Sequence, residues 1–137
     1  MPERNSKLPS PIKISEDLYA GWRSFTLAAA VELERYDLVI LGHILHGQSR
    51  EWARRLIEKA AGALRGRGMM LIGEFIPNDR RTGPAVPLLF GLNMLVNAPE
   101  GDVYTMAEYR TWLKAAGMRS LKTIRAPQAS PLILATK

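Results

Sequence analysis

The segment YDLVILGHILHGQSREW, residues 36–52, runs from aliphatic side chains into the two histidines of the chain, His43 and His46. A short aliphatic run bounded by polar residues is typical of a strand that is buried on both faces. Ser49 follows at a position suited to a helix N-cap, because its hydroxyl can accept a hydrogen bond from a free amide of the first turn. We therefore predict a strand over residues 36–43, a turn at His46 and a helix after Ser49.

The residues after Ser49 complete a strand, helix, strand unit. Apolar side chains recur on one helical face up to Leu64, and Gly66 and Gly68 are expected to end the helix. The segment MMLIGEFI, residues 69–76, is a second aliphatic strand. Two strands joined by a helix lie parallel, and we expect these two to be neighbours in one sheet.

The rest of the sequence alternates loops with short elements. Prolines and a glycine favour a loop over residues 77–87, and LLFGLNMLV predicts a short apolar helix over residues 88–96. The segments RSLKTIRA, residues 119–126, and PLILATK, residues 131–137, have strand-like patterns. Because only a short turn joins them, we expect these two strands to be antiparallel.

The segment TMAEYRTWLKAAG contains the most complete set of helix signals in the chain. Thr105 and Glu108 have the spacing of a capping box, in which each side chain accepts a hydrogen bond from the backbone amide of the other residue. Gly117 suits the C-terminal end, where the backbone turns left-handed. The pattern predicts a helix over residues 105–116.

Composition limits the classes of protein that the chain can belong to. Its 137 residues suit one domain, and 47% hydrophobic with 23% charged residues is ordinary for a globular protein. No apolar run approaches the roughly 20 residues of a membrane span, and a secretory signal is absent, so we expect a cytoplasmic protein without a membrane span. With no cysteine and two histidines, we expect neither disulfides nor a metal site.

The formal charge of +6 raises the question of nucleic-acid binding. Basic residues gather on or just after the predicted helix that follows Ser49, but they are mixed with Glu51 and Glu58. The aromatic side chain among them, Trp52, falls on the predicted apolar face of the helix, so none is interleaved on the solvated face to stack on bases. We interpret this pattern as the solvated face of a helix and expect no nucleic-acid partner.

His46 and Glu74 follow the two strands that are predicted to be parallel neighbours. In an open parallel sheet, ligands bind beyond the carboxyl ends of the strands, which places both side chains on the ligand-facing edge. An imidazole there suits a general base at neutral pH. The alternative is structural: His46 as a turn residue, Glu74 as the partner of an arginine, and His43 as a hydrogen-bonded core or sheet-edge histidine.

Five motifs occur in the order found in the C-terminal half of the small-molecule O-methyltransferases: ILHGQ with His46, ALRGRG, LIGEF with Glu74, YTMAEY and AAGM. Residues 36–137 thus resemble this Rossmann-like family, which includes plant phenolic and bacterial antibiotic O-methyltransferases. The resemblance implies an α/β half-sheet. Two parallel strands with a crossover helix would be followed by a helix and a final antiparallel strand pair.

The same resemblance implies the transfer of a methyl group from S-adenosylmethionine to the hydroxyl of a small-molecule methyl acceptor. His46 would be the catalytic base. Glu74 would be a second catalytic residue, which either holds the imidazole tautomer or contacts the acceptor. Asn97 would contact the acceptor, unless it only caps its loop.

Residues 1–35 are not matched to the family. Residues 1–13 are interpreted as a loosely attached arm, and residues 14–35 as either a helix or a degraded strand. The glycine-rich loop and the acidic residue that bind the cofactor in the family have no counterpart before Tyr36. We therefore expect the cofactor-binding strands to be missing, S-adenosylmethionine to bind this chain weakly, and the strand edge at 37–43 to pair in a homodimer or with a missing N-terminal half. The alternative is a non-catalytic interaction module.

Overall fold

The computed structural model describes residues 36–126 and 130–137. The arm, and the helix or strand considered for residues 14–35, lie outside the described residues. In chain order the elements are β1 (Tyr36–Gly42), the 3-10 turn η1 (Leu45–Gly47), α2 (Arg50–Ala63), β2 (Leu64–Gly73), α3 (Ala85–Asn97), α4 (Met106–Ala115), β3 (Ser120–Ile124) and β4 (Leu132–Thr136).

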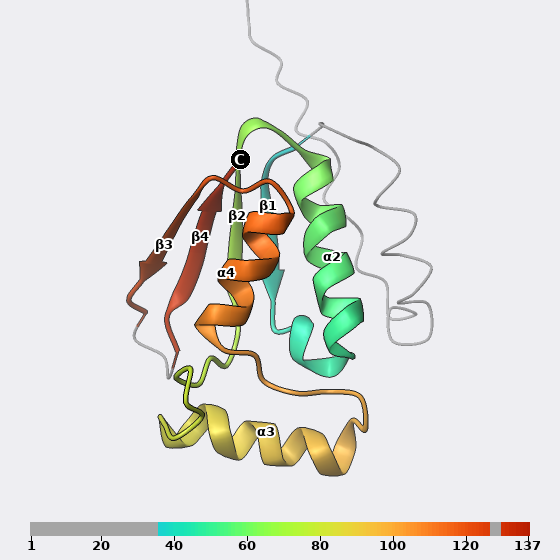
Figure 1. The fold of residues 1–137 in the computed structure, drawn as a ribbon, viewed down its shortest axis with the longest axis vertical. Coiled ribbons are helices and arrows are strands. Elements are labelled where there is room, and N and C mark those ends of the chain that lie inside the picture. The colour runs from blue at the N-terminus through green and yellow to red at the C-terminus, as the bar shows by residue number, and fades with distance from the viewer. Residues whose placement is uncertain (1–35, 127–129) are drawn as a thin grey trace, which may run out of the picture.

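The four strands form one sheet in the order β1-β2-β4-β3 (Figure 1). β1 and β2 are parallel, with Val39 opposite Met70, whereas β4 runs antiparallel to both β2 and β3. The predicted parallel pair and the predicted antiparallel final pair are both confirmed. The last strand inserts between β2 and β3, so it ties the C-terminus to the centre of the sheet.

Helices α2 and α4 lie side by side over the same face of the sheet (Figure 1). The core forms between this face and the two helices, and it includes Ile57, Met70, Leu113 and Ile133. The opposite face of β1 is open, because no described helix covers it: Leu38 is 47% exposed and Ile40 is 63% exposed. The prediction that this strand is buried on both faces was therefore wrong for the described part of the chain.

The second strand begins earlier than predicted. α2 ends at Ala63, and Leu64 already has the extended backbone of β2. Gly66 and Gly68 therefore lie inside the strand and do not end the helix. The pairing with β1 is irregular here, and Gly68 is needed because a Cβ would lie 2.9 Å from the carbonyl oxygen of Arg65. The glycines lie where β2 begins irregularly. In the sequence, such a position looks the same as the end of a helix.

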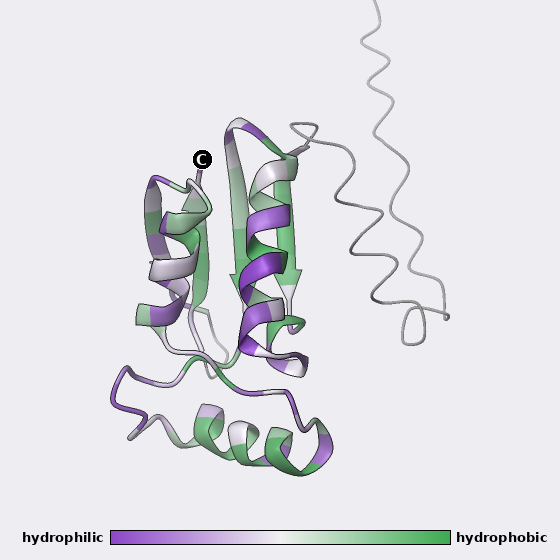
Figure 2. Cartoon of the chain, turned by 45° about the vertical axis from the view of Figure 1, so that its right-hand side comes forward, coloured by the Kyte–Doolittle hydropathy of each residue, from purple (hydrophilic) through white to green (hydrophobic). Residues whose placement is uncertain are grey.

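Helix α3 also begins earlier than predicted, at Ala85, so that Pro87 lies in its first turn. Proline is tolerated there because the first amides of a helix have no intrahelical partner. The helix lies apart from α2 and α4, across the end of the sheet towards which β1 points, and most of it is hydrophobic (Figures 1 and 2). Neither this helix nor another in the described residues is long and apolar enough to cross a membrane.

The predicted caps of α4 are confirmed. The Thr105 side chain accepts from the Glu108 amide, and the Thr105 amide donates to the Glu108 carboxylate at 2.7 Å. At the other end Gly117 has φ +86°, and the amides of Gly117 and Met118 donate to the carbonyls of Lys114 and Leu113. This pair of bonds is the Schellman motif, which leaves few unsatisfied carbonyls at the helix end.

We expect Thr105→Ala to lower the free energy of unfolding by about 1 kcal/mol, because the N-cap oxygen is lost. Urea unfolding of the two proteins measures this difference. Thr111→Ala is the matched control, since the Thr111 hydroxyl only donates to the carbonyl of Ala107 inside the same helix. Equal stability of the Thr105 and Thr111 variants would show that the box does not stabilise α4.

Candidate active site

The carboxyl ends of β1 and β2 carry the two candidate catalytic residues. Because the strands are parallel neighbours, their ends meet at one edge of the sheet. His46 lies in η1, just after β1, and Glu74 directly follows β2. The prediction that both side chains lie at the carboxyl edge of the sheet is confirmed.

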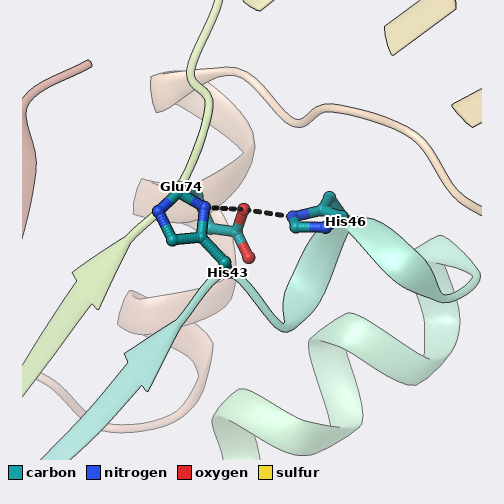
Figure 3. A group of neighbouring side chains, drawn as sticks. All are labelled: His43, His46 and Glu74. Carbon is teal, nitrogen blue, oxygen red and sulfur yellow. Dashed lines mark hydrogen bonds and ion pairs between the residues drawn. The ribbon is translucent and has the colours of Figure 1, made fainter. Parts of the chain in front are cut away.

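Glu74 is only 3% exposed, and each of its carboxylate oxygens has a partner. Oε1 accepts from the backbone amide of Leu45 at 2.7 Å, and Oε2 lies 2.7 Å from Nδ1 of His46 (Figure 3). With an ionised carboxylate, which can only accept, the proton of a neutral imidazole lies on Nδ1 and Nε2 is the basic nitrogen, for which the described residues show no hydrogen-bond partner. The buried carboxylate therefore orients the histidine, and the alternative of an arginine partner for Glu74 is not what the described residues show.

His43 differs from the expected strand histidine. β1 ends at Gly42, and His43 follows it with a left-handed backbone, φ 51°, while its amide donates to the carbonyl of Gly73 at 2.8 Å. Its side chain is 51% exposed, and its Nδ1 lies 4.0 Å from Oε2 of Glu74 (Figure 3). His43 is thus a half-exposed neighbour of the His46–Glu74 pair at the end of the sheet, to which its amide still bonds, and not a core residue.

Two phenylalanines adjoin the pair, and sequence reasoning missed both. Phe75 follows Glu74 and stacks on Phe90 of α3, with centroids 4.1 Å apart. The His46 ring meets Phe90 edge to face at 4.7 Å. Adjacency to Glu74 could have identified Phe75, but no local signal places α3 against η1. The two rings form an apolar wall beside the imidazole.

His43, His46 and Glu74 also offer three possible metal ligand atoms within 4.8 Å of one another. However, Nδ1 of His46 and Oε2 of Glu74 already share a hydrogen bond, and a cation bound by these atoms would have to replace it.

Asn97, the predicted acceptor contact, ends α3 and is exposed. Its Nδ2 donates to the carbonyl of Asn93 at 3.1 Å and to Oδ1 of Asn93 at 2.7 Å. Among the described residues these bonds tie it to its own helix and not to His46 or Glu74.

The basic residues of α2 are arranged as predicted for a solvated helix face. Arg54 and Arg55 pair with Glu51, and Arg54 also contacts Glu58. The hydrogen bond from Arg54 is the main cause that lowers the pKa of Glu51. Within α2, much of the positive charge is thus balanced by neighbouring carboxylates.

Comparison with known proteins places this arrangement in a family. Residues 29–119 match the O-methyltransferase domain, so the match begins before Tyr36, within the segment that the sequence motifs left unmatched. The chain is 35% identical over 104 residues to 3-hydroxy-5-methyl-1-naphthoate 3-O-methyltransferase of Streptomyces sahachiroi, covering 74% of this chain and 30% of the relative. It is 37% identical over 106 residues to acetylserotonin O-methyltransferase of Bos taurus, covering 77% of this chain and 30% of the relative.

Solved structures agree with this match. Human N-acetylserotonin methyltransferase in complex with SAM superposes with a TM-score of 0.70 at 31% identity, over 77% of this chain and 30% of that one. An O-methyltransferase family 2 protein from Planctomyces limnophilus in complex with apigenin gives 0.72 at 30% identity, over 80% and 33%. The chain thus spans about a third of the length of these proteins. On its sequence and its fold, the chain belongs to the O-methyltransferase domain family.

Proposed function

We propose that this chain carries the acceptor-activating part of an S-adenosylmethionine-dependent O-methyltransferase that acts on a small-molecule hydroxyl. The single observation that supports the proposal most is the bond from Nδ1 of His46 to the buried carboxylate of Glu74. This bond leaves Nε2 of His46 free to accept a proton. His46 is the general base, and Glu74 is the residue that orients it.

In the reaction, Nε2 of His46 takes the hydroxyl proton of the acceptor, and the charge of the resulting imidazolium is offset by Glu74 across the 2.7 Å bond. S-adenosylmethionine, when bound, supplies an electrophilic methyl group, so the protein mainly has to align the acceptor and remove its proton. The low exposure of Glu74 strengthens its attraction to the imidazolium, because little water screens the pair.

The wall of Phe75 and Phe90 suits an acceptor with an aromatic ring, which would pack against it with its hydroxyl towards His46. The names of two similar proteins point the same way, since one acts on a hydroxynaphthoate and another is in complex with apigenin. Asn97 remains a candidate acceptor contact, which would exchange its bonds with Asn93 for the ligand. An unchanged KM for the acceptor in the Asn97→Ala variant would show that Asn97 does not contact the acceptor.

Methyl transfer to a panel of phenols, naphthols and matched arylamines tests the proposal. A full-length polypeptide that carries this chain is incubated with methyl-labelled S-adenosylmethionine, and the products are identified by mass spectrometry. We expect the label on hydroxyl oxygen. Transfer to nitrogen alone, or no transfer while the cofactor binds, would contradict the proposed function.

The described residues fit the acceptor side of such a site better than the cofactor side. Three glycines have no room for a side chain because other parts of the chain lie against them. A Cβ on Gly68 would meet Arg65, one on Gly91 would meet Val103, and one on Gly101 would meet His46. None of these glycines forms the open turn that a cofactor loop needs. We therefore assign no cofactor contact to Gly68, Gly91 or Gly101.

From this fit we expect the 137-residue chain to bind S-adenosylmethionine weakly or not at all. We also expect it to self-associate, because β1 has only β2 beside it among the described strands and exposes Leu38 and Ile40. Calorimetry with the cofactor and light scattering test both expectations. Micromolar binding by a monomer would contradict them and would show that residues 1–35 help to build the site.

A further inference from the structure

The loop between α3 and α4, residues 98–105, contacts the backbone of the candidate base. The amide of Asp102 donates to the carbonyl oxygen of His46 at 3.0 Å. Gly101 lies so close to the same oxygen that a Cβ on it would be 2.5 Å away. Real Cβ atoms do not approach an oxygen this closely, so the contact requires glycine at position 101.

A second anchor lies just after His46. The hydroxyl of Tyr104 donates to the carbonyl oxygen of Gln48 at 2.8 Å, and the residue is 1% exposed. Burial is the main cause that raises the pKa of Tyr104 to about 12, so the hydroxyl keeps its proton at neutral pH. The loop therefore holds the η1 turn on both sides of Gly47.

Four charged side chains fasten the loop to its surroundings. Arg81 lies 3.3 Å from Asp102 and 3.4 Å from Glu108, and Arg50 pairs with the same two carboxylates. These residues come from α2, from the segment after β2, from the loop itself and from α4. The arginines are 37% and 54% exposed, so each pair contributes little energy, but together they fix where the loop lies.

We infer that Gly101 and Asp102 are positioning residues for His46. Glu74 and Phe90 hold the imidazole ring, whereas the loop holds the main chain that carries it. A general base must lie within hydrogen-bond reach of its proton, and a shift of the order of 1 Å can lower a rate severely. We call the contact of Gly101 and Asp102 with the main chain of His46 the clamp. Its catalytic role rests on the proposed function, whereas its geometry does not.

Gly101→Ala tests the clamp, and Gly47→Ala is the matched control. Both changes add one methyl group near His46, but a Cβ on Gly47 meets nothing within 4 Å. The first readout is the Nδ1 proton of His46 in NMR spectra of the chain, which the bond to Glu74 protects from exchange with water. We expect this resonance in the parent and in Gly47→Ala, and we expect it to be lost or shifted in Gly101→Ala while the other amide resonances remain dispersed.

The second readout is methyl transfer by a full-length polypeptide. We expect Gly101→Ala to lower kcat roughly 10-fold with the KM of the cofactor unchanged, and Gly47→Ala to keep most of kcat. If Gly101→Ala fails to fold, the Arg81→Gln variant is used in its place, because the loss of the arginine loosens the loop without a clash. We expect a broadened His46 resonance and a kcat about two- to fivefold lower in Arg81→Gln.

The clamp would be contradicted if the His46 resonance were unchanged in folded Gly101→Ala, or in Arg81→Gln where that variant is used. Equal effects of Gly101→Ala and Gly47→Ala would also contradict it. If the His46 resonance shifts but kcat stays the same, the result would instead contradict the role of His46 as the general base. The two ideas therefore fail in different experiments.

Discussion

Replacing His46 with alanine is expected to lower kcat for methyl transfer by about 100-fold or more, the scale of a lost general base. Nε2 is the ring nitrogen that can accept the proton, because Nδ1 is bonded to Glu74. The dissociation constant of S-adenosylmethionine should stay nearly constant, because the change removes a group that acts in the transition state. Initial rates and calorimetry on a full-length polypeptide measure both quantities.

His43→Ala is the matched control for this experiment. It removes the other imidazole, which is half exposed and lies 4.0 Å from the carboxylate of Glu74 without a hydrogen bond to it. We expect this variant to keep most of kcat. Equal losses in the two variants would show that the site needs its local shape or charge and not a base at position 46.

Glu74→Gln is expected to lower kcat by about 100-fold as well, through the tautomer of His46. The glutamine amide can donate to Nδ1, which would move the imidazole proton to Nε2 and block its role as a base. The folded structure should survive, since a carbonyl oxygen can still accept from the amide of Leu45. Steady-state kinetics, together with NMR of the imidazole nitrogens, follows rate and tautomer in the same variant.

Glu74→Ala separates the structural role of this carboxylate from its chemical one. It leaves the buried amide of Leu45 and Nδ1 of His46 without an acceptor, so we expect a loss of about 1–3 kcal/mol in stability that Glu74→Gln does not show. A Glu74→Gln enzyme with full activity and the same tautomer as the parent would contradict the orienting role.

Local patterns predicted the parts of the fold that depend on neighbours in sequence. The aliphatic runs identified β1 and most of β2, and their parallel pairing followed from the helix between them. The capping box of Thr105 and Glu108 identified the N-cap of α4, which begins at Met106. The pairing of His46 with Glu74 could be predicted because parallel strands bring their carboxyl ends together.

The features that were missed depend on contacts between distant segments. The open face of β1 depends on which face the helices cover, and the strand pattern does not contain that information. His43 leaves the strand in a left-handed conformation that is unusual for a residue other than glycine. The contacts of Phe90 and Gly101 with the His46 region arise because α3 and its loop fold back over η1, which no local signal predicts.

The central claim is that His46 removes the proton of the acceptor hydroxyl, and it is tested most directly with acceptors of different acidity. Rates of methyl transfer by the parent and by His46→Ala are measured for a series of ring-substituted naphthols at one pH. An acceptor that is already ionised needs no base, so we expect the defect of His46→Ala to be about 100-fold for the least acidic naphthols and to disappear for the most acidic ones. A defect of the same size across the whole series would contradict the assignment of His46 as the general base.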